Sequence, residues 1–244
     1  MSQQALMELL IAGIEEKEEF CGSDDDILDI SEWKGVTLNE NGEVTKVNWS
    51  CLDISGGLEL HWLPPAVEHF VANGNKLEGS IDLTELPPSL TVLALHECQF
   101  EGEISLVSLP SKMRLLEVYM NKLEGSLNLD LLPASLEHLD VGRNLFEGTV
   151  CLTKLPPKMI LIGVDLNALS GTVDLTQLPV TLRTLRIGGN PFEGETDFSK
   201  LPKSLEQLYI NNTNLSGDIS GIRKRMYVWW IGSWELRSSS ERIL

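Results

Sequence analysis

Residues 132–154, LPASLEHLDVGRNLFEGTVCLTK, contain the pattern that decides the fold of this chain. The Leu-Pro pair that opens the segment recurs along the chain at a constant interval of 23 residues, from Leu63 to Leu201. A constant period of about 20 to 29 residues is typical of a solenoid, in which each unit buries its apolar face only by stacking on its neighbours. The sequence therefore predicts a one-dimensional stack of coils.

When the leucine of each Leu-Pro pair is counted as position 1, the fifth, eighth and tenth positions are apolar almost throughout. In residues 132–154 these positions are Leu136, Leu139 and Val141. The eighth and tenth positions alternate as in a short strand with one buried face, so each unit is expected to add one strand to a parallel sheet on the concave side. The thirteenth position is mostly asparagine, as at Asn144. A column of asparagines can satisfy the buried backbone groups where the chain leaves each strand.

Every unit has a glycine four positions after the asparagine position, and at Gly148 it permits a bend that a side chain would block. After the glycine comes an apolar–polar–apolar triplet, such as Val150-Cys151-Leu152, which predicts a second short strand on the convex side. Proline at the second position lacks an amide hydrogen and suits the turn into the next inner strand.

The consensus LPxxLxxLxLxxNxLxGxIxL resembles leucine-rich repeats, and its NxLxGxIxL half resembles the plant-specific class of that family. The opening LPxxL is also similar to the repeats of bacterial effectors. The resemblance implies a mostly β, α/β-type solenoid: a right-handed superhelix with a parallel concave sheet, short convex strands and a helical N-terminal cap. It covers residues from about 40 to 221 and implies a scaffold that binds other macromolecules.

The repeat frame divides the chain into three parts: an N-terminal helical cap at 1–39, a solenoid of eight coils at 40–221 whose first coil is degenerate, and a Trp-rich C-terminal cap and tail at 222–244. The segment WKGVT at 33–37 resembles the WxGV segment of plant-type caps. The C-terminal part is expected to be a capping strand or, alternatively, a docking segment; its candidate residues are Tyr227, Trp229, Trp230 and Trp234.

The formal net charge of −17 disfavours binding to nucleic acids or to anionic membranes. No stretch of about 18 apolar residues predicts a membrane span. The four cysteines form no CxxC pair, so neither a zinc site nor a disulfide framework is expected, and no cofactor is indicated. The N-terminus does not resemble a signal peptide. These features favour a cytoplasmic protein, with an extracellular location as the alternative if the chain is a piece of a longer one.

Side chains at the seventh, ninth and eleventh positions should project from the concave sheet. Several of them are apolar where solvent would otherwise lie, which usually marks a contact surface, and carboxylates flank them. We therefore expect a site in the middle coils for a protein or peptide with a basic and apolar surface, the alternative being an ordinary mixed surface. The candidate residues are Val92, Leu115, Glu117, Tyr119, Asp140, Leu161 and Asp165.

Catalysis and metal binding are not expected. Glu117 and Asp140 should lie on adjacent strands, but no nucleophile or oxyanion donor accompanies them, so a solvated acidic surface is the preferred interpretation. His69 and His138 would be three coils apart, roughly 14 Å, too far to share one metal ion. The predicted function is a non-catalytic protein–protein interaction module, with a ligand-sensing ectodomain of a receptor-like protein as the alternative and the oligomeric state left open.

Overall fold

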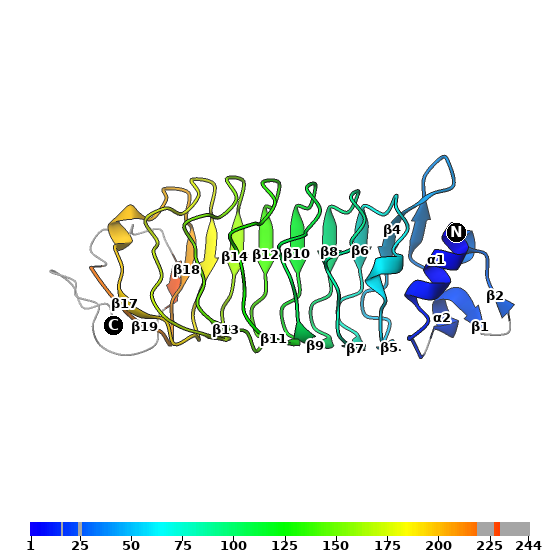
Figure 1. The fold of residues 1–244 in the computed structure, drawn as a ribbon, viewed down its shortest axis with the longest axis horizontal. Coiled ribbons are helices and arrows are strands. Elements are labelled where there is room, and N and C mark those ends of the chain that lie inside the picture. Colours follow the sequence, from blue (N-terminus) through cyan, green and yellow to red (C-terminus); the bar gives the residue numbers. More distant parts are fainter. Residues whose placement is uncertain (16, 24–25, 219–226, 230–244) are drawn as a thin grey trace.

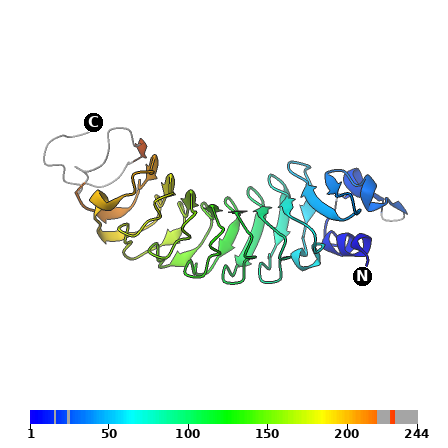
Figure 2. The ribbon, with the colours of Figure 1, turned by 90° about the horizontal axis from the view of Figure 1, so that it is seen from above.

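The chain forms a β-solenoid whose coils stack along one axis, as the 23-residue period predicts (Figure 1). A computed structural model describes residues 1–15, 17–23, 26–218 and 227–229. Seen from above, the stack bends into a shallow arc (Figure 2). Among the described residues, no helix has the length and apolar character that crossing a membrane requires.

A ten-stranded sheet runs along the concave side. Seven of its strands, one from each coil that begins with Leu-Pro, occupy the seventh to ninth repeat positions. All pairings from β4 to β20 are parallel, whereas β3 pairs with β4 antiparallel. The strands are β3 (Val36–Leu38), β4 (Val44–Asn48), β6 (His69–Val71), β8 (Val92–Ala94), β10 (Leu115–Glu117), β12 (His138–Asp140), β14 (Leu161–Gly163), β16 (Thr184–Arg186), β18 (Gln207–Tyr209) and β20 (Tyr227–Trp229).

Short parallel strands also line the convex side, but the prediction of their position was wrong. They lie before or around the repeat glycine rather than on the triplet that follows it: β5 (Ser55–Gly56), β7 (Lys76–Gly79), β9 (Gln99–Glu103), β11 (Lys122–Glu124), β13 (Glu147–Gly148), β15 (Ala168–Leu169), β17 (Glu193–Glu195) and β19 (Asn214–Ser216).

The repeat glycine and a polar turn explain why the triplets form no strand. The glycine adopts a positive φ, 83° at Gly79 and 80° at Gly148, which turns the chain out of the extended conformation. Three residues after Gly79, the Asp82 carboxylate accepts a hydrogen bond of 2.8 Å from the amide of Thr84 and bends the backbone again. The flanking triplet residues, Ile81 and Leu83, are still buried, so the triplet serves the core without joining a sheet.

A continuous apolar core runs through the coils, and the predicted fifth, eighth and tenth positions fill it. In the coil of β12, Leu136, Leu139 and Val141 have no exposed surface. The Leu-Pro turn recurs with the same hydrogen bond, in which the amide of the fifth residue donates to the proline carbonyl, at 2.9 Å from Leu136 to Pro133. The prediction of a stacked core entered by a proline turn is therefore confirmed.

The asparagine column forms the expected ladder. Asn144 Oδ1 accepts a hydrogen bond of 3.0 Å from the amide of Leu123, and its Nδ2 donates to the carbonyls of Val118 and Val141 at 3.0 Å. Each such asparagine thereby joins its own coil to the preceding one; the same arrangement occurs at Asn75, Asn121, Asn167 and Asn190. Where Cys98 and Thr213 replace asparagine, hydrogen bonds to Ala72 O at 3.6 Å and to Ile210 O at 2.9 Å preserve part of it.

The N-terminal end of the stack is covered by α1 (Gln3–Leu10), α2 (Glu18–Cys21), the β1–β2 hairpin (Gly22–Ser23 and Asp26–Ile27) and β3. Three aromatic rings fill this region, with the Phe20 ring 4.8 Å from Trp49 and 6.2 Å from Trp33 between centroids. Both indole nitrogens donate to backbone carbonyls, Trp33 to Leu28 and Trp49 to Lys34. Short 3-10 helices lie at Ile30–Glu32, Leu60–Trp62 and Phe198–Lys200. The three-part division of the chain stays a prediction.

Replacing Asn144 with Asp tests the ladder, because the change keeps the shape of the side chain and removes its two donors. We expect a loss of about 3 kcal/mol in the free energy of unfolding, since the carbonyls of Val118 and Val141 each lose one of their two asparagine donors and a carboxyl is buried. Urea unfolding measures it. Asn128→Asp is the matched control: Asn128 is exposed, and its Oδ1 only accepts from the amide of Asp130, which aspartate also does. Equal losses in the two variants would contradict the ladder's role.

Candidate binding site on the concave face

The register of the concave sheet places the apolar candidates in one column. Leu115 pairs with Val92 on one side and with His138 on the other, and His138 pairs with Leu161. The structure thus makes Val92 and Leu115 neighbours and separates Leu161 from them by one histidine. All four side chains are half-buried.

The charged and aromatic candidates fall into two adjacent columns. Glu117 pairs with Asp140, and the same column continues through Gly163 to Arg186. Tyr119 and Asp165 belong to the eleventh repeat position, two coils apart. The backbone ladder continues past the strands, with Met120 N bound to Gly142 O and Arg143 N bound to Asp165 O, so these positions also stay in register.

Asp140 is not the solvated carboxylate that the sequence predicts. It is 4% exposed, and its Oδ2 accepts a hydrogen bond of 2.9 Å from Arg186 Nη1, while Oδ1 accepts one of 3.1 Å from the amide of Gly142. Arg186 lies two coils away and reaches over the intervening strand at Gly163. A Cβ at residue 163 would lie 2.6 Å from Asp140 Oδ1. The glycine therefore makes this ion pair possible.

Burial raises the pKa of Asp140 from 3.8 to about 6. The hydrogen bond from Gly142 and the charge of Arg186 act against this rise, and the carboxylates of Asp165 and Glu117 add to it. Burial likewise raises the pKa of Asp165, although Arg186 and Arg143 lower it. The site thus holds more buried negative charge than Arg186 neutralises.

His96 and Tyr119 form a stacked ring pair, with centroids 4.3 Å apart and planes 10° from parallel. His96 Nδ1 lies 3.6 Å from Glu117 Oε2 and has no hydrogen-bond partner in the part of the chain that the structure describes. Burial lowers the pKa of His96, although Glu117 and Glu97 act to raise it. The imidazole is therefore an aromatic neighbour of Tyr119 rather than a fixed cation.

Sequence reasoning missed Arg186 and His96 as parts of this site. Both stood in the columns that contain the candidates, Arg186 in the ninth and His96 in the eleventh. The signal that could have found Arg186 was the glycine between it and Asp140, which leaves room for a long side chain to cross. The stacking of His96 on Tyr119 follows from their adjacent places in one column.

Apolar side chains also lie along the edge where the chain leaves the concave sheet. Met120 and Leu166 are 40% and 42% exposed, and both adopt a positive φ, 55° and 54°. Bulky residues rarely adopt this conformation, which glycine occupies at the equivalent position in other coils, as at Gly189. The exposure of Met120 and Leu166 extends the apolar part of the candidate surface.

The Trp-rich end is described in part. The strand β20 (Tyr227–Trp229) pairs in parallel with β18, with Tyr227 opposite Gln207 and Trp229 opposite Tyr209. Trp230 and Trp234 lie outside the described residues. The interpretations of this end as a capping strand and as a docking segment both stay predictions.

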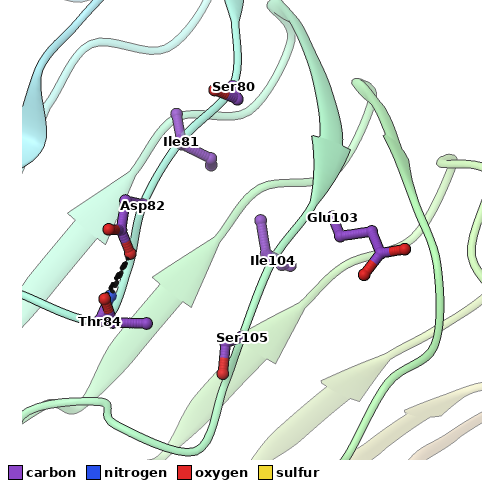
Figure 3. Close-up of a pocket in the computed structure, with 7 residues that line it drawn as sticks. All are labelled: Ser80, Ile81, Asp82, Thr84, Glu103, Ile104 and Ser105. Atoms are coloured by element: carbon purple, nitrogen blue, oxygen red, sulfur yellow. Dashed lines mark hydrogen bonds between the residues drawn. The ribbon is translucent and has the colours of Figure 1, made fainter.

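The convex side carries an open hollow between the coils of β7 and β9 (Figure 3). Its polar groups do not converge on a common point, because the Asp82 carboxylate already binds the amide and hydroxyl of Thr84. Nowhere in the described ranges do three His, Cys, Asp or Glu side chains come together as metal ligands would. The concave cluster is therefore the candidate site; the hollow is lined by Ser80, Ile81, Asp82, Thr84, Glu103, Ile104 and Ser105.

No family model and no curated protein matches the chain, but solved structures do. The Arabidopsis receptor kinase HAESA, in complex with the peptide hormone IDA and a co-receptor, has a TM-score of 0.75 at 21% identity over 96% of this chain and 41% of that one. The leucine-rich-repeat ectodomain of the Arabidopsis membrane receptor kinase GASSHO1/SCHENGEN3 gives 0.66 at 21% identity over 93% and 29%. A plant ice-binding protein gives 0.50 at 15% identity over 98% of both chains.

These similarities establish the class of fold. The protein is a leucine-rich-repeat solenoid of the kind found in plant leucine-rich-repeat domains, with a period of 23 residues, as the sequence predicts. The chain spans less than half the length of the two receptor structures that it resembles.

The raised pKa of Asp140 predicts a pH dependence of stability. Because the folded state binds the proton more tightly than the unfolded state, the contribution of Asp140 to stability falls as the pH rises from about 4 to about 6.5. Relative to Asp140→Asn, the wild-type protein should lose up to about 3 kcal/mol over this range. Urea unfolding at a series of pH values measures the difference. A difference that does not vary with pH would contradict the shift.

Gly163→Ala tests the crossing of Arg186 over β14. The added methyl group would approach Asp140 Oδ1 to 2.6 Å and Cγ to 2.8 Å, so one of the paired side chains must move. We expect a loss of about 1–3 kcal/mol in unfolding free energy. Gly57→Ala is the control, because a Cβ there meets nothing closer than 3.9 Å. Thermal unfolding compares them, and equal midpoints would argue against the crossing.

Proposed function

We propose that this protein is a non-catalytic interaction module, a scaffold that binds a partner protein or peptide on its concave face across β8, β10, β12 and β14. The observation that carries the proposal is the register of the sheet. It places the half-buried apolar pair Val92 and Leu115 beside the carboxylates of Glu117 and Asp140 and the ring of Tyr119. A surface on which apolar side chains lie beside charged and aromatic ones is typical of protein-binding sites.

The chemistry of the cluster favours a partner that is both basic and apolar. The formal net charge of −17 attracts basic proteins over a distance, and the carboxylates of Glu117, Asp140 and Asp165 concentrate negative charge at the site. Leu161, together with Met120 and Leu166 at the edge, supplies apolar contact area on the same coils. Association should therefore weaken as salt rises, without vanishing.

The comparisons support binding in general terms. HAESA is solved in complex with a peptide hormone and a co-receptor, and a second structure of this fold, with a TM-score of 0.51, is a complex of two Arabidopsis proteins, BIR3 and SERK2. A concave sheet of the same architecture offers this chain an extended surface for a partner.

A second candidate, a ligand-sensing ectodomain of a receptor-like protein, is favoured by the similarity to receptor-kinase ectodomains. The cysteines Cys21, Cys51, Cys98 and Cys151 are all free thiols, which suits a reducing compartment better and supports a cytoplasmic module. Immunoblotting of fractionated cells separates the two. A cytosolic band of about 27 kDa supports the module, and a larger band in the membrane fraction supports the receptor.

The test of the module is partner capture with matched variants. Glu117→Lys and Tyr119→Ala change the concave face, and Glu124→Lys makes the same charge change on the exposed convex strand β11. Partners captured by the wild-type protein are identified by mass spectrometry, purified and titrated against each variant. We expect the concave variants to bind at least about tenfold more weakly and Glu124→Lys to bind within about twofold of wild type.

Circular dichroism of each variant controls for folding. A partner whose affinity is unchanged by both concave variants, or is lost equally in Glu124→Lys, would place the binding surface elsewhere and contradict the proposal.

A further inference from the structure

On the concave face, one arginine already lies between a carboxylate and an aromatic ring, in space left by a glycine. The guanidinium of Arg186 is bound to the Asp140 carboxylate at 2.9 Å and lies over the Tyr209 ring, 6.0 Å from its centroid. The space it occupies exists because Gly163 has no side chain. A carboxylate, a glycine and an aromatic ring thus suffice on this sheet to seat a guanidinium.

The same three parts recur in the next column without a cation. Tyr119, Gly142 and Asp165 follow one another in successive coils, as the hydrogen bonds of the backbone ladder show. His96 covers one face of the Tyr119 ring, and on the other side Gly142 presents no side chain. Asp165 leans over this glycine, because its Oδ1 lies 2.8 Å from where a Cβ of residue 142 would be.

The surroundings of this gap are mostly negative, although the charges of Arg186 and Arg143 also act on Asp165. Burial and the carboxylates of Glu97, Glu117 and Asp140 all raise the pKa of Tyr119. Within the described ranges, the Asp165 carboxylate accepts a hydrogen bond from its own amide but from no side chain, and no cation lies over the Tyr119 ring. Asp140 is shared between the filled arrangement and the gap, because its Oδ1 lies 3.2 Å from the same Cβ position at residue 142.

The dimensions of the gap suit a planar group. Two strand spacings separate the coils of Tyr119 and Asp165, roughly 9.5 Å. A guanidinium stacked on a ring lies at about 3.5 Å from it, which leaves its edge within hydrogen-bond reach of a carboxylate that leans inward. An ammonium group has no flat face with which to stack and keeps more of its hydration.

We propose that the gap over Gly142 binds the guanidinium of an arginine on the partner, stacked on Tyr119 and paired with Asp165 and Asp140. The inference rests on the proposed function and names the side chain that the concave site recognises. The partner's arginine completes a second copy of the arrangement that the chain forms internally with Arg186.

The experiment uses the whole chain and two probe peptides of identical shape. One is acetyl-Leu-Arg-Leu-amide, and in the other citrulline replaces arginine, which removes the charge and replaces one NH2 group, with its two donors, by a carbonyl oxygen. Titrations followed by the backbone amide signals of Gly142 and its neighbours should show at least about tenfold tighter binding of the arginine peptide. Because this comparison needs no variant, it does not depend on any variant folding.

Variants then locate the site. Asp165→Asn keeps the shape of the side chain and should remove most of the preference for arginine, and Tyr119→Leu should weaken the arginine peptide by about five- to tenfold. Glu124→Gln on β11 is the control and should leave both affinities unchanged.

Equal affinities for the two peptides would overturn the inference, as would an undiminished preference for arginine in Asp165→Asn. These failures are distinguishable from failure of the proposed function. If partner capture still depends on Glu117 while the two peptides bind alike, the module stands and the arginine site does not. If capture is indifferent to every concave change, the proposed function itself fails.

Discussion

Every coil of this protein must provide hydrogen-bond partners for the backbone amides and carbonyls that become buried where the chain leaves the concave strand. The asparagine column satisfies them in two coils at once, because Asn144 and its counterparts accept from an amide of the preceding coil and donate to carbonyls of both coils. An unpaired buried amide or carbonyl is costly enough that the spacing of the coils is fixed by this need. The constant 23-residue period reflects this requirement, because it places an asparagine at the same point of successive coils.

The ladder also explains why the concave face can be described residue by residue. Because each asparagine sets the register between neighbouring coils, side chains at one repeat position form straight columns, and chemistry on the face depends on which residues follow one another along a column. Glycine then has a particular role. At Gly163 it lets an arginine cross a strand to a buried carboxylate, and at Gly142 it leaves room for the carboxylates of Asp165 and Asp140 to approach the backbone.

Much of the fold could be predicted because the repeat is nearly perfect. The concave strands, the buried leucines, the asparagine ladder and the proline turn all follow from residues that recur at fixed positions. The convex strands were misplaced because the alternation of Val150, Cys151 and Leu152 reflects burial alone, whereas sheet pairing depends on the backbone direction that the preceding glycine sets. At the site, the positions of Glu117, Tyr119 and Asp140 could be predicted, but the burial of Asp140 could not, since it depends on a side chain 46 residues away.

The ion pair between Asp140 and Arg186 has a mechanical consequence. In a solenoid each coil contacts only its neighbours, so the stack can bend and can unfold coil by coil from an end. This pair joins coils that are not neighbours and encloses the intervening β14 beneath it. The ion pair therefore resists bending of the arc at this place and couples three coils, so that they are expected to unfold together. If the concave face binds a partner as proposed, this rigidity lowers the entropic cost of binding beside Gly142.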